Sequence, residues 1–317
     1  MCGPHAEAIL HEVKRKIIIG YDDSPNSADA LELGKQLCEV LAADAVVACS
    51  LPLPRYLLGD EMLEAAVRED TEMLFEKARE EFSGLEVRME AVIDSSPARA
   101  LFELADAEKP LLMVVGSSHR GSVGRVLLGS VGQRLVEGLP CGLAVAPHGY
   151  ATGRATHLLR IGAAVDGSDE SMAALRTAIG LAERLHARLR VFSVQTLPTY
   201  TCSGAPGVAL VDLERAMERE AAGVLTAAIE AVPSGLPVDG VKPKGDPADC
   251  LERASENLDL LVMGSRSYGP LRRVLLGSVS ANLMRTARCP LLVVPRAAGD
   301  DPLGFESLRT AGSLVTW

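Results

Sequence analysis

The heptapeptide "RVLLGSV" occurs twice in this chain, at residues 125–131 and again at residues 273–279. The offset between the copies, 148 residues (273 − 125), also aligns further glycine, cysteine and proline positions: Gly116 with Gly264, Gly121 with Gly269, Cys141 with Cys289, and Pro147 with Pro295. Upstream, "IIIGYDDSPNSADALELG" from Ile17 corresponds to "IGAAVDGSDESMAALRTA" from Ile161. This correspondence is far longer than a solenoid repeat, so the sequence predicts a duplicated domain.

The chain of 317 residues is long enough for two domains, since single domains commonly span about 100 to 200 residues. We place the first domain at residues 13–148 and the second at 157–296, joined by a linker rich in glycine and small residues. The tail at 297–317 has no counterpart in the first half, and we expect it to be loosely ordered.

The composition excludes several classes of partner. A net charge of −10 and a pI of about 5.2 would repel nucleic acid, and aromatic residues at 3 % leave few rings to stack on bases or to anchor in a membrane. No window reaches the ~20 apolar residues of a membrane-spanning helix, and the N-terminus does not read as a signal peptide. The seven cysteines are scattered and include no C-x-x-C pair, so we expect reduced, mostly buried thiols. We therefore expect a cytoplasmic protein that binds neither nucleic acid nor membrane.

Within each half, short apolar runs alternate with helical patterns, which is typical of a parallel sheet with crossover helices. The first half offers the strands "KIIIG", "AVVACS", "EVRMEAVI", "LLMVVG" and "GLAVAP", and the second offers "RIGAAV", "RLRVFSV", "PVDGV", "LLVMG" and "PLLVVP". N-cap residues mark the expected helix starts: Ser24, Ser96, Ser168 and Asp246. The sequence predicts an α/β fold of two tandem Rossmann-like domains, each a five-stranded, mainly parallel sheet flanked by helices.

In such sheets, ligands bind beyond the carboxyl ends of the strands, where the strand order reverses. Asp22 and Asp166 follow the first strand of each half. After the fourth strand, one loop runs from Gly116 to Gly129 and Ser130, and its counterpart runs from Gly264 to Gly277 and Ser278. Because the free N–H groups of a helix start bind anions, a phosphate would fit at each loop end. Nearby arginines would add positive charge: Arg120, Arg125, Arg266, Arg272 and Arg273.

These motifs also have simpler interpretations. A glycine and a serine before a helix form a turn with an N-cap in many proteins, and a carboxylate at a helix start is favoured by the helix dipole. His119 suits an exposed loop residue as well as a functional one, and the arginines suit a solvated surface. Neither a P-loop lysine nor a G-x-G-x-x-G motif follows the strands. Both interpretations stay open on the sequence alone.

Taken together, the order D-x-S-x-x-S, then G-x(4)-G-x(7)-G-S between apolar strands, then P-x-x-V-V-P resembles the universal stress protein family in its tandem two-domain form. The resemblance covers about residues 13 to 296. It implies an adenine-nucleotide alpha-hydrolase-like fold, ATP as ligand with or without Mg²⁺, and a role in stress adaptation. It also implies that the two halves pair through their fifth strands, as an internal pseudo-dimer.

The family's ATP-binding members carry G-x-x-G-x(9)-G-[ST], and this pattern assigns the binding residues by position. The resemblance implies a first-half set of Asp22, Gly116, Gly129 and Ser130, and a second-half set of Asp166, Gly264, Ser265, Ser267, Gly277 and Ser278. Asp166 would lie near the ribose or adenine, Gly264 and Ser267 along the phosphates, and Gly277 with Ser278 at their end.

Both halves depart from that pattern at its second glycine, where His119 and Ser267 stand. The first half departs further, with Asp23 where the second half has Gly167, and a carboxylate there would repel a triphosphate. The sequence therefore predicts that the second half is the better nucleotide site.

Three hypotheses about function follow. The leading one is a nucleotide-dependent regulator of the stress response, and the alternative is a nucleotide-independent interaction or signalling protein with degenerate pockets. The third is an enzyme such as a slow ATPase, although no catalytic residues or metal ligands stand out in the sequence. We also expect a protein partner and a homodimer, although no motif in the sequence identifies either.

Overall fold

The computed structural model describes residues 15–51, 61–82, 86–94, 96–118, 123–136, 138–153, 157–196, 207–265, 277–295, 303 and 305. Several residues discussed above lie outside these ranges: His119, Arg120, Gly121, Arg266, Ser267, Gly269, Arg272 and Arg273.

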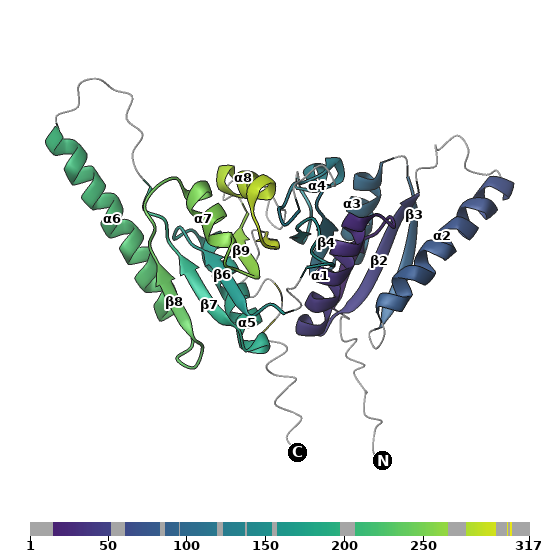
Figure 1. Ribbon diagram of the computed structural model, residues 1–317, viewed down its shortest axis with the longest axis horizontal. Helices are drawn as coiled ribbons and strands as arrows, with labels where there is room; N and C mark the ends of the chain where they lie inside the picture. The colour runs from purple at the N-terminus through teal and green to yellow at the C-terminus, as the bar shows by residue number, and fades with distance from the viewer. Residues whose placement is uncertain are drawn as a thin grey trace, which may run out of the picture.

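The chain forms two tandem α/β domains with the same order of elements (Figure 1). The first contains β1 (Lys16–Gly20), α1 (Pro25–Leu41), β2 (Asp44–Leu51), α2 (Glu61–Glu81), β3 (Val87–Ile93), α3 (Pro97–Glu108), β4 (Leu112–Gly116), α4 (Ser130–Leu135) and β5 (Gly142–Ala146). The second contains β6 (Arg160–Ala164), α5 (Asp169–Leu185), β7 (Arg188–Phe192), α6 (Gly207–Glu230), β8 (Val238–Val241), α7 (Pro247–Ser255), β9 (Leu260–Gly264), α8 (Ser278–Thr286) and β10 (Leu291–Val294). Every strand expected from the sequence is present.

The described strands form one sheet in the order β3-β2-β1-β4-β5-β10-β9-β6-β7-β8. Neighbours within a domain are parallel, as expected for strands joined by crossover helices. The domains join where β5 pairs antiparallel with β10, with Leu143 opposite Val293 and Val145 opposite Leu291. The fifth strands therefore pair as the family resemblance implied.

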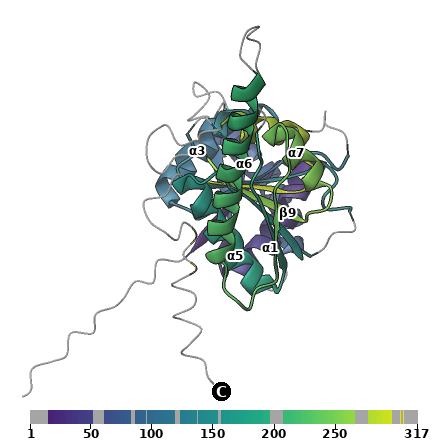
Figure 2. The same cartoon turned by 90° about the vertical axis from the view of Figure 1, so that its left-hand side faces the viewer.

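Helices cover both faces of this sheet, which explains why its central strands are apolar without alternation. Ile17 and Ile19 of β1 pack in one core cluster with α1, α2, α5 and α6, whereas Ile18 packs in a second cluster with α3, α4, α7 and α8. Figure 2 shows α6 toward the viewer, with α3 and α7 on either side of it and α1 and α5 below. All three isoleucines are fully buried.

The predicted N-caps stand at the starts of their helices. Ser24 Oγ accepts a hydrogen bond from Ser27 N–H, and Ser168 Oγ accepts one from Ser171 N–H. The Asp246 carboxylate accepts hydrogen bonds from two backbone N–H groups in the first turn of α7. Ser96 occupies the N-cap of α3 without such a bond, and its hydroxyl instead accepts a hydrogen bond from Arg134 at 3.3 Å. Local sequence therefore determines where these helices begin.

The first copy of the heptapeptide, residues 125–131, lies at the interface between the domains. Val126 N–H donates to Ala287 O at 2.7 Å and Leu128 N–H donates to Met284 O at 3.0 Å. Met284 belongs to the last turn of α8, and Ala287 is the residue after this helix. The side chains of Val126 and Leu128 are buried. This first copy thus packs between the domains and also leads into the start of α4.

The linker docks onto α1 through a buried carboxylate. Asp29 accepts hydrogen bonds from Gly149 N–H and Ala151 N–H, both at 2.8 Å, and Tyr150 donates from its hydroxyl to Gln36 at 2.8 Å. Burial raises the pKa of Asp29. Residues 149–151 of the linker therefore form a turn that is hydrogen bonded to α1.

The two described tail residues are also buried. Leu303 and Phe305 join the core cluster that contains α1 and α5, and Arg15 donates a hydrogen bond to Leu303 O. At these two positions the expectation of a loosely ordered tail is wrong, because the tail supplies an aromatic ring to α5 at a glycine, Gly180.

The cysteine prediction is confirmed for the described thiols, since Cys38, Cys49, Cys141, Cys250 and Cys289 are free and buried. Within the described ranges, no helix is long and apolar enough to cross a membrane. The same residues contain no group of three or more His, Cys, Asp or Glu side chains that could hold a metal ion.

Candidate ligand site at the carboxyl ends of β6 and β9

Strand order reverses between β1 and β4 in the first domain and between β6 and β9 in the second. Asp22 follows β1 and Gly116 ends β4, while Asp166 follows β6 and Gly264 ends β9. The topology therefore brings each aspartate and its glycine to one crevice, the location at which open α/β sheets bind ligands.

The second crevice contains a cavity of about 720 Å³. Its polar lining includes Asp166, Ser168, Ser193, Thr196, Glu220, Ser265, Ser278 and Ser280. Its apolar lining includes Val165, Phe192, Val194, Met217, Val224, Leu251, Met263 and Val279. An apolar cavity with a few converging polar groups is the usual form of a small-molecule site.

Asp166 is held by the start of α5. Its Oδ1 accepts hydrogen bonds from Ser168 N–H at 3.0 Å and from Ser168 Oγ at 2.6 Å. Partial burial raises the pKa of the Asp166 carboxyl, but these hydrogen bonds outweigh burial and leave the pKa below its ordinary value. The carboxylate is therefore ionised at neutral pH and acts as a hydrogen-bond acceptor.

The first domain repeats this turn closely. Asp22 Oδ1 accepts from Ser24 N–H at 3.1 Å and from Ser24 Oγ at 2.5 Å. Both aspartates thus position a helix start, as one of the sequence interpretations held, and Asp166 also lines the cavity.

Gly116 and Gly264 are required by helix packing. A Cβ at Gly116 would lie 1.8 Å from Asn26 O, and a Cβ at Gly264 would lie 2.7 Å from the backbone of Glu170. Each glycine lets the first turn of α1 or α5 approach the end of the fourth strand. This packing role is independent of any ligand, although Gly264 also lines the cavity.

Gly277 and Ser278 form the start of α8, and both line the cavity. Gly277 N–H donates to Ser280 Oγ at 2.8 Å, which satisfies one N–H group of this helix start. Ser278 is a solvent-exposed residue of this lining. In the first domain, Gly129 and Ser130 start α4, a helix of only 6 residues.

Ser265, the residue after β9, is buried at the cavity wall, and its Oγ has no hydrogen-bond partner among the described residues. Its counterpart Ser117 is equally buried, but Ser117 Oγ donates to Ala146 O at 2.7 Å and accepts from Leu127 N–H at 3.3 Å. Buried hydroxyls without partners are uncommon, and one that faces a cavity is an open contact for a ligand.

The first crevice differs at Asp23, which has a φ of 59° where the second domain has Gly167 at 85°. The Asp23 carboxylate accepts hydrogen bonds from Tyr21 Oη at 3.0 Å and from Lys77 Nζ at 2.6 Å. The Lys77 hydrogen bond holds the pKa of Asp23 below its ordinary value, and burial raises the pKa of Tyr21. We call these three residues, Tyr21, Asp23 and Lys77, the first-domain clasp.

The structure therefore places Asp166, Gly264, Ser265, Gly277 and Ser278 around one cavity. Ser267 lies outside the described residues, and Asp22, Gly116, Gly129 and Ser130 belong to the other crevice. The cavity wall supplied by α6, with Met217 and Glu220, was missed from the sequence. No motif marks this wall, because only the packing of α6 along β7 and β8 brings it there.

The fold and the cavity define an open, doubly wound α/β protein with tandem domains and a small-molecule-type cavity at one switch point. The family model described as "Universal stress protein family" matches residues 14–147 and 158–295. The chain belongs to the universal stress protein family.

Relatives and solved structures agree with this membership. The chain is similar to universal stress protein Rv2005c of Mycobacterium tuberculosis, 31 % identical over 209 residues that cover 66 % of this chain and 69 % of the relative. It is also similar to Rv2319c of that organism, 26 % identical over 299 residues, covering 88 % and 99 %. A universal stress protein structure from Archaeoglobus fulgidus shares the fold, with a TM-score of 0.64 at 20 % identity over 89 % of this chain and 98 % of that one.

Proposed function

We propose that this protein binds an adenine nucleotide in the second-domain cavity and that occupancy of the cavity controls its conformation or its choice of partner during stress. The observation that carries the proposal is Ser265 Oγ, a buried hydroxyl at the cavity wall that no described residue satisfies. Its counterpart in the first domain is fully hydrogen bonded by the chain itself.

The lining residues fit the parts of a nucleotide. The N–H groups at the start of α8 and the Ser265 hydroxyl would bind phosphate oxygens, since helix N-termini favour anions. The Asp166 carboxylate would accept hydrogen bonds from ribose hydroxyls. Apolar side chains such as Met217 and Val224 would contact the base.

The charge of the lining favours a nucleotide that brings its own cation. Asp166 and Glu220 line the cavity, and no lysine or arginine is among its described lining residues. Mg²⁺ usually binds through substrate phosphates and water rather than through a protein cage, which agrees with the absence of a metal-ligand cluster in the described ranges. When bound, Mg²⁺ would offset the repulsion between the phosphates and these carboxylates.

The test compares matched aspartates in the two domains. We would denature the purified protein, quantify released adenine nucleotide per chain, and measure ATP, ADP and AMP binding by calorimetry with Mg²⁺. We expect about one nucleotide site per chain, weakened by Asp166→Asn and unchanged by Asp22→Asn. Both substitutions remove a similar turn-stabilising carboxylate, so an equal effect of the two would contradict the assignment to the second domain.

The second candidate is a nucleotide-independent interaction protein, and the first-domain clasp favours it. Asp23 is tied to Tyr21 and Lys77 at the position where the second domain has Gly167. A domain whose crevice is held by its own ion pair suits a role through its surface. This candidate would be favoured over ours if denaturation released no nucleotide and calorimetry detected no binding of added nucleotide.

A further inference from the structure

Two helices run from the second-domain cavity to the first domain. Pro247 and Leu251 of α7, and Gly277 to Ser280 around the start of α8, line the cavity. The segment 125–128 of the first domain contacts α7 at Glu252, the residue after Leu251, and contacts the C-terminal end of α8. Each helix therefore contacts both the proposed nucleotide site and the first domain, α8 with its opposite ends and α7 with the neighbouring residues Leu251 and Glu252.

The C-terminal end of α8 is capped by the first domain. Helix C-termini leave carbonyl groups without intrahelical partners. Two such carbonyls, Met284 O and Ala287 O, accept hydrogen bonds from Leu128 N–H at 3.0 Å and Val126 N–H at 2.7 Å. The side chains of Val126 and Leu128 pack in the same core cluster as Leu283 and Met284.

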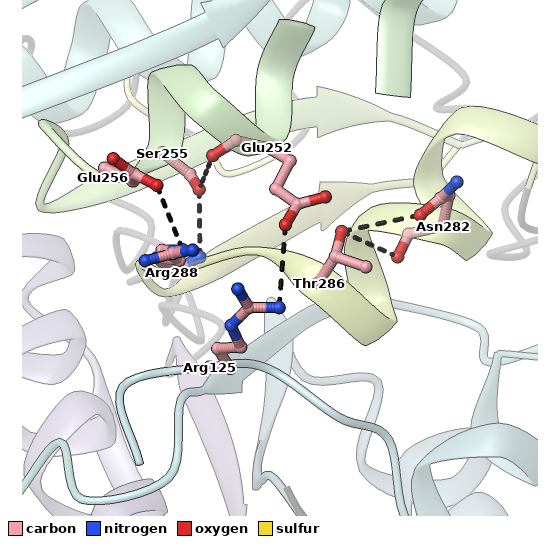
Figure 3. A network of polar contacts seen from close by, with 7 residues as sticks. All are labelled: Arg125, Glu252, Ser255, Glu256, Asn282, Thr286 and Arg288. Atoms are coloured by element: carbon pink, nitrogen blue, oxygen red, sulfur yellow. Dashed lines mark hydrogen bonds and ion pairs between the residues drawn. The ribbon is translucent and has the colours of Figure 1, made fainter. Parts of the chain in front are cut away.

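Figure 3 shows the polar contacts that join α7, α8 and the first domain. Arg125 Nη1 lies 3.7 Å from Glu252 Oε1, so an ion pair crosses the domain boundary to α7. Ser255 Oγ accepts from Arg288 N–H at 2.9 Å, and Arg288 Nε lies 3.2 Å from Glu256 Oε1. These bonds tie the end of α7 to the chain that follows α8.

We propose that the segment 125–128 of the first domain positions the nucleotide cavity of the second domain, acting through Glu252 on α7 and through the C-terminal carbonyls of α8. The inference rests on the proposed function, because the ligand it concerns is the nucleotide proposed above. It adds that the two domains are not independent binding units. Arg125 is a positioning residue, because none of its described contacts is with a residue that lines the cavity.

The mechanical basis is the shortness of the two helices. Each has 9 residues, so each is about 14 Å long at roughly 1.5 Å per residue. A short helix moves as a unit, and a displacement at its C-terminal end shifts its N-terminal N–H groups relative to Ser265. Sites of this kind lose affinity when their supporting contacts are loosened.

The test is a charge swap across the domain boundary. Arg125→Glu places two carboxylates at the contact, and we expect the calorimetric Kd for Mg-ATP to rise roughly three- to ten-fold. Arg125→Glu combined with Glu252→Arg restores an opposite pair and should return the Kd to within about two-fold of wild type. The matched control is the exposed pair Arg79–Glu72 on α2, where Arg79→Glu should leave the Kd unchanged.

A second readout separates this inference from the proposed function. In ligand-free protein, Arg125→Glu should speed hydrogen exchange at the amides of α7 and α8, and the double swap should reverse that change. If wild type binds no nucleotide, the proposed function fails and the exchange measurement alone decides whether positioning exists. Unchanged exchange, or a raised Kd that the double swap does not rescue, would overturn the inference.

Discussion

Ser117 and Ser265 occupy the same position after the fourth strand of their domains, but within the described parts of the chain Ser117 Oγ donates to Ala146 O at 2.7 Å and Ser265 Oγ has no partner. Duplication alone would give both serines the same partners. Among the described residues, nothing satisfies the Ser265 hydroxyl at the cavity wall, whereas Ser117 Oγ also accepts a hydrogen bond from Leu127 N–H. The asymmetry of the tandem domains is therefore expressed in their hydrogen bonding as well as in their sequences.

Alanine substitutions at these serines should affect different properties: ligand affinity at Ser265 and folding stability at Ser117. Ser265→Ala should weaken Mg-ATP binding roughly five-fold, because it removes one ligand hydrogen bond, without lowering the stability of the ligand-free protein. Ser117→Ala should leave affinity unchanged and cost about 1 kcal/mol of unfolding free energy. Calorimetry and urea unfolding measure the two effects. Equal affinity losses in both variants would show that Ser265 does not contact the ligand.

The glycines that end β4 and β9 should tolerate no side chain. Gly116→Ala and Gly264→Ala would each force a Cβ against backbone atoms of α1 or α5, and backbone cannot move aside as a flexible side chain can. We expect each to lower the unfolding free energy by about 3 kcal/mol, with Gly116→Ala the more severe because its Cβ would lie 1.8 Å from Asn26 O.

Gly223 provides the control for that measurement. It is exposed within α6, and a Cβ there would meet nothing within 4 Å. Gly223→Ala should therefore stabilise the protein by about 0.5 to 1 kcal/mol through helix propensity. Comparable losses at all three glycines would mean that packing at the strand ends is not the cause.

The sequence predicted those features that depend on neighbouring residues. Strands, N-caps and the helix starts at Ser130 and Ser278 follow from local patterns, and the structure confirms them. What stayed hidden depends on distant packing. No local signal tells that Val126 and Leu128 cap α8, that Asp29 binds the linker, or that α6 forms a wall of the cavity. For the same reason, the duplicated sequence identified Gly116 and Gly264 as equivalent positions, but it did not predict that they pack against α1 and α5.

Glu108 should make part of the protein's stability depend on pH. Its carboxylate pairs with Lys16 at 2.5 Å and with Arg88 at 2.7 Å, and these hydrogen bonds hold the pKa of Glu108 below its ordinary value. A lowered folded-state pKa adds stability above the unfolded value, about 4.3, and that stability is lost as the pH falls through the folded-state pKa.

The variant Glu108→Gln isolates this contribution. At pH 7 it should be about 1 kcal/mol less stable than wild type, and the difference should shrink below a pH of about 4.3. Urea unfolding of both proteins across this range measures the gap. A gap that stays constant with pH would show that Glu108 contributes through packing and not through its charge.

Phe305 should be a stabilising contact although it lies beyond the last strand. Its ring sits at Gly180 of α5, where an added Cβ would come within 2.5 Å of the ring. Phe305→Ala should lower the unfolding free energy by about 3 kcal/mol, since a buried ring is replaced by a void. Gly180→Ala should destabilise as well, because the new methyl group displaces the ring. The two losses should not add in the double variant, since the methyl group no longer meets a ring. Full additivity in urea unfolding would mean that the ring and Gly180 are not in contact in solution.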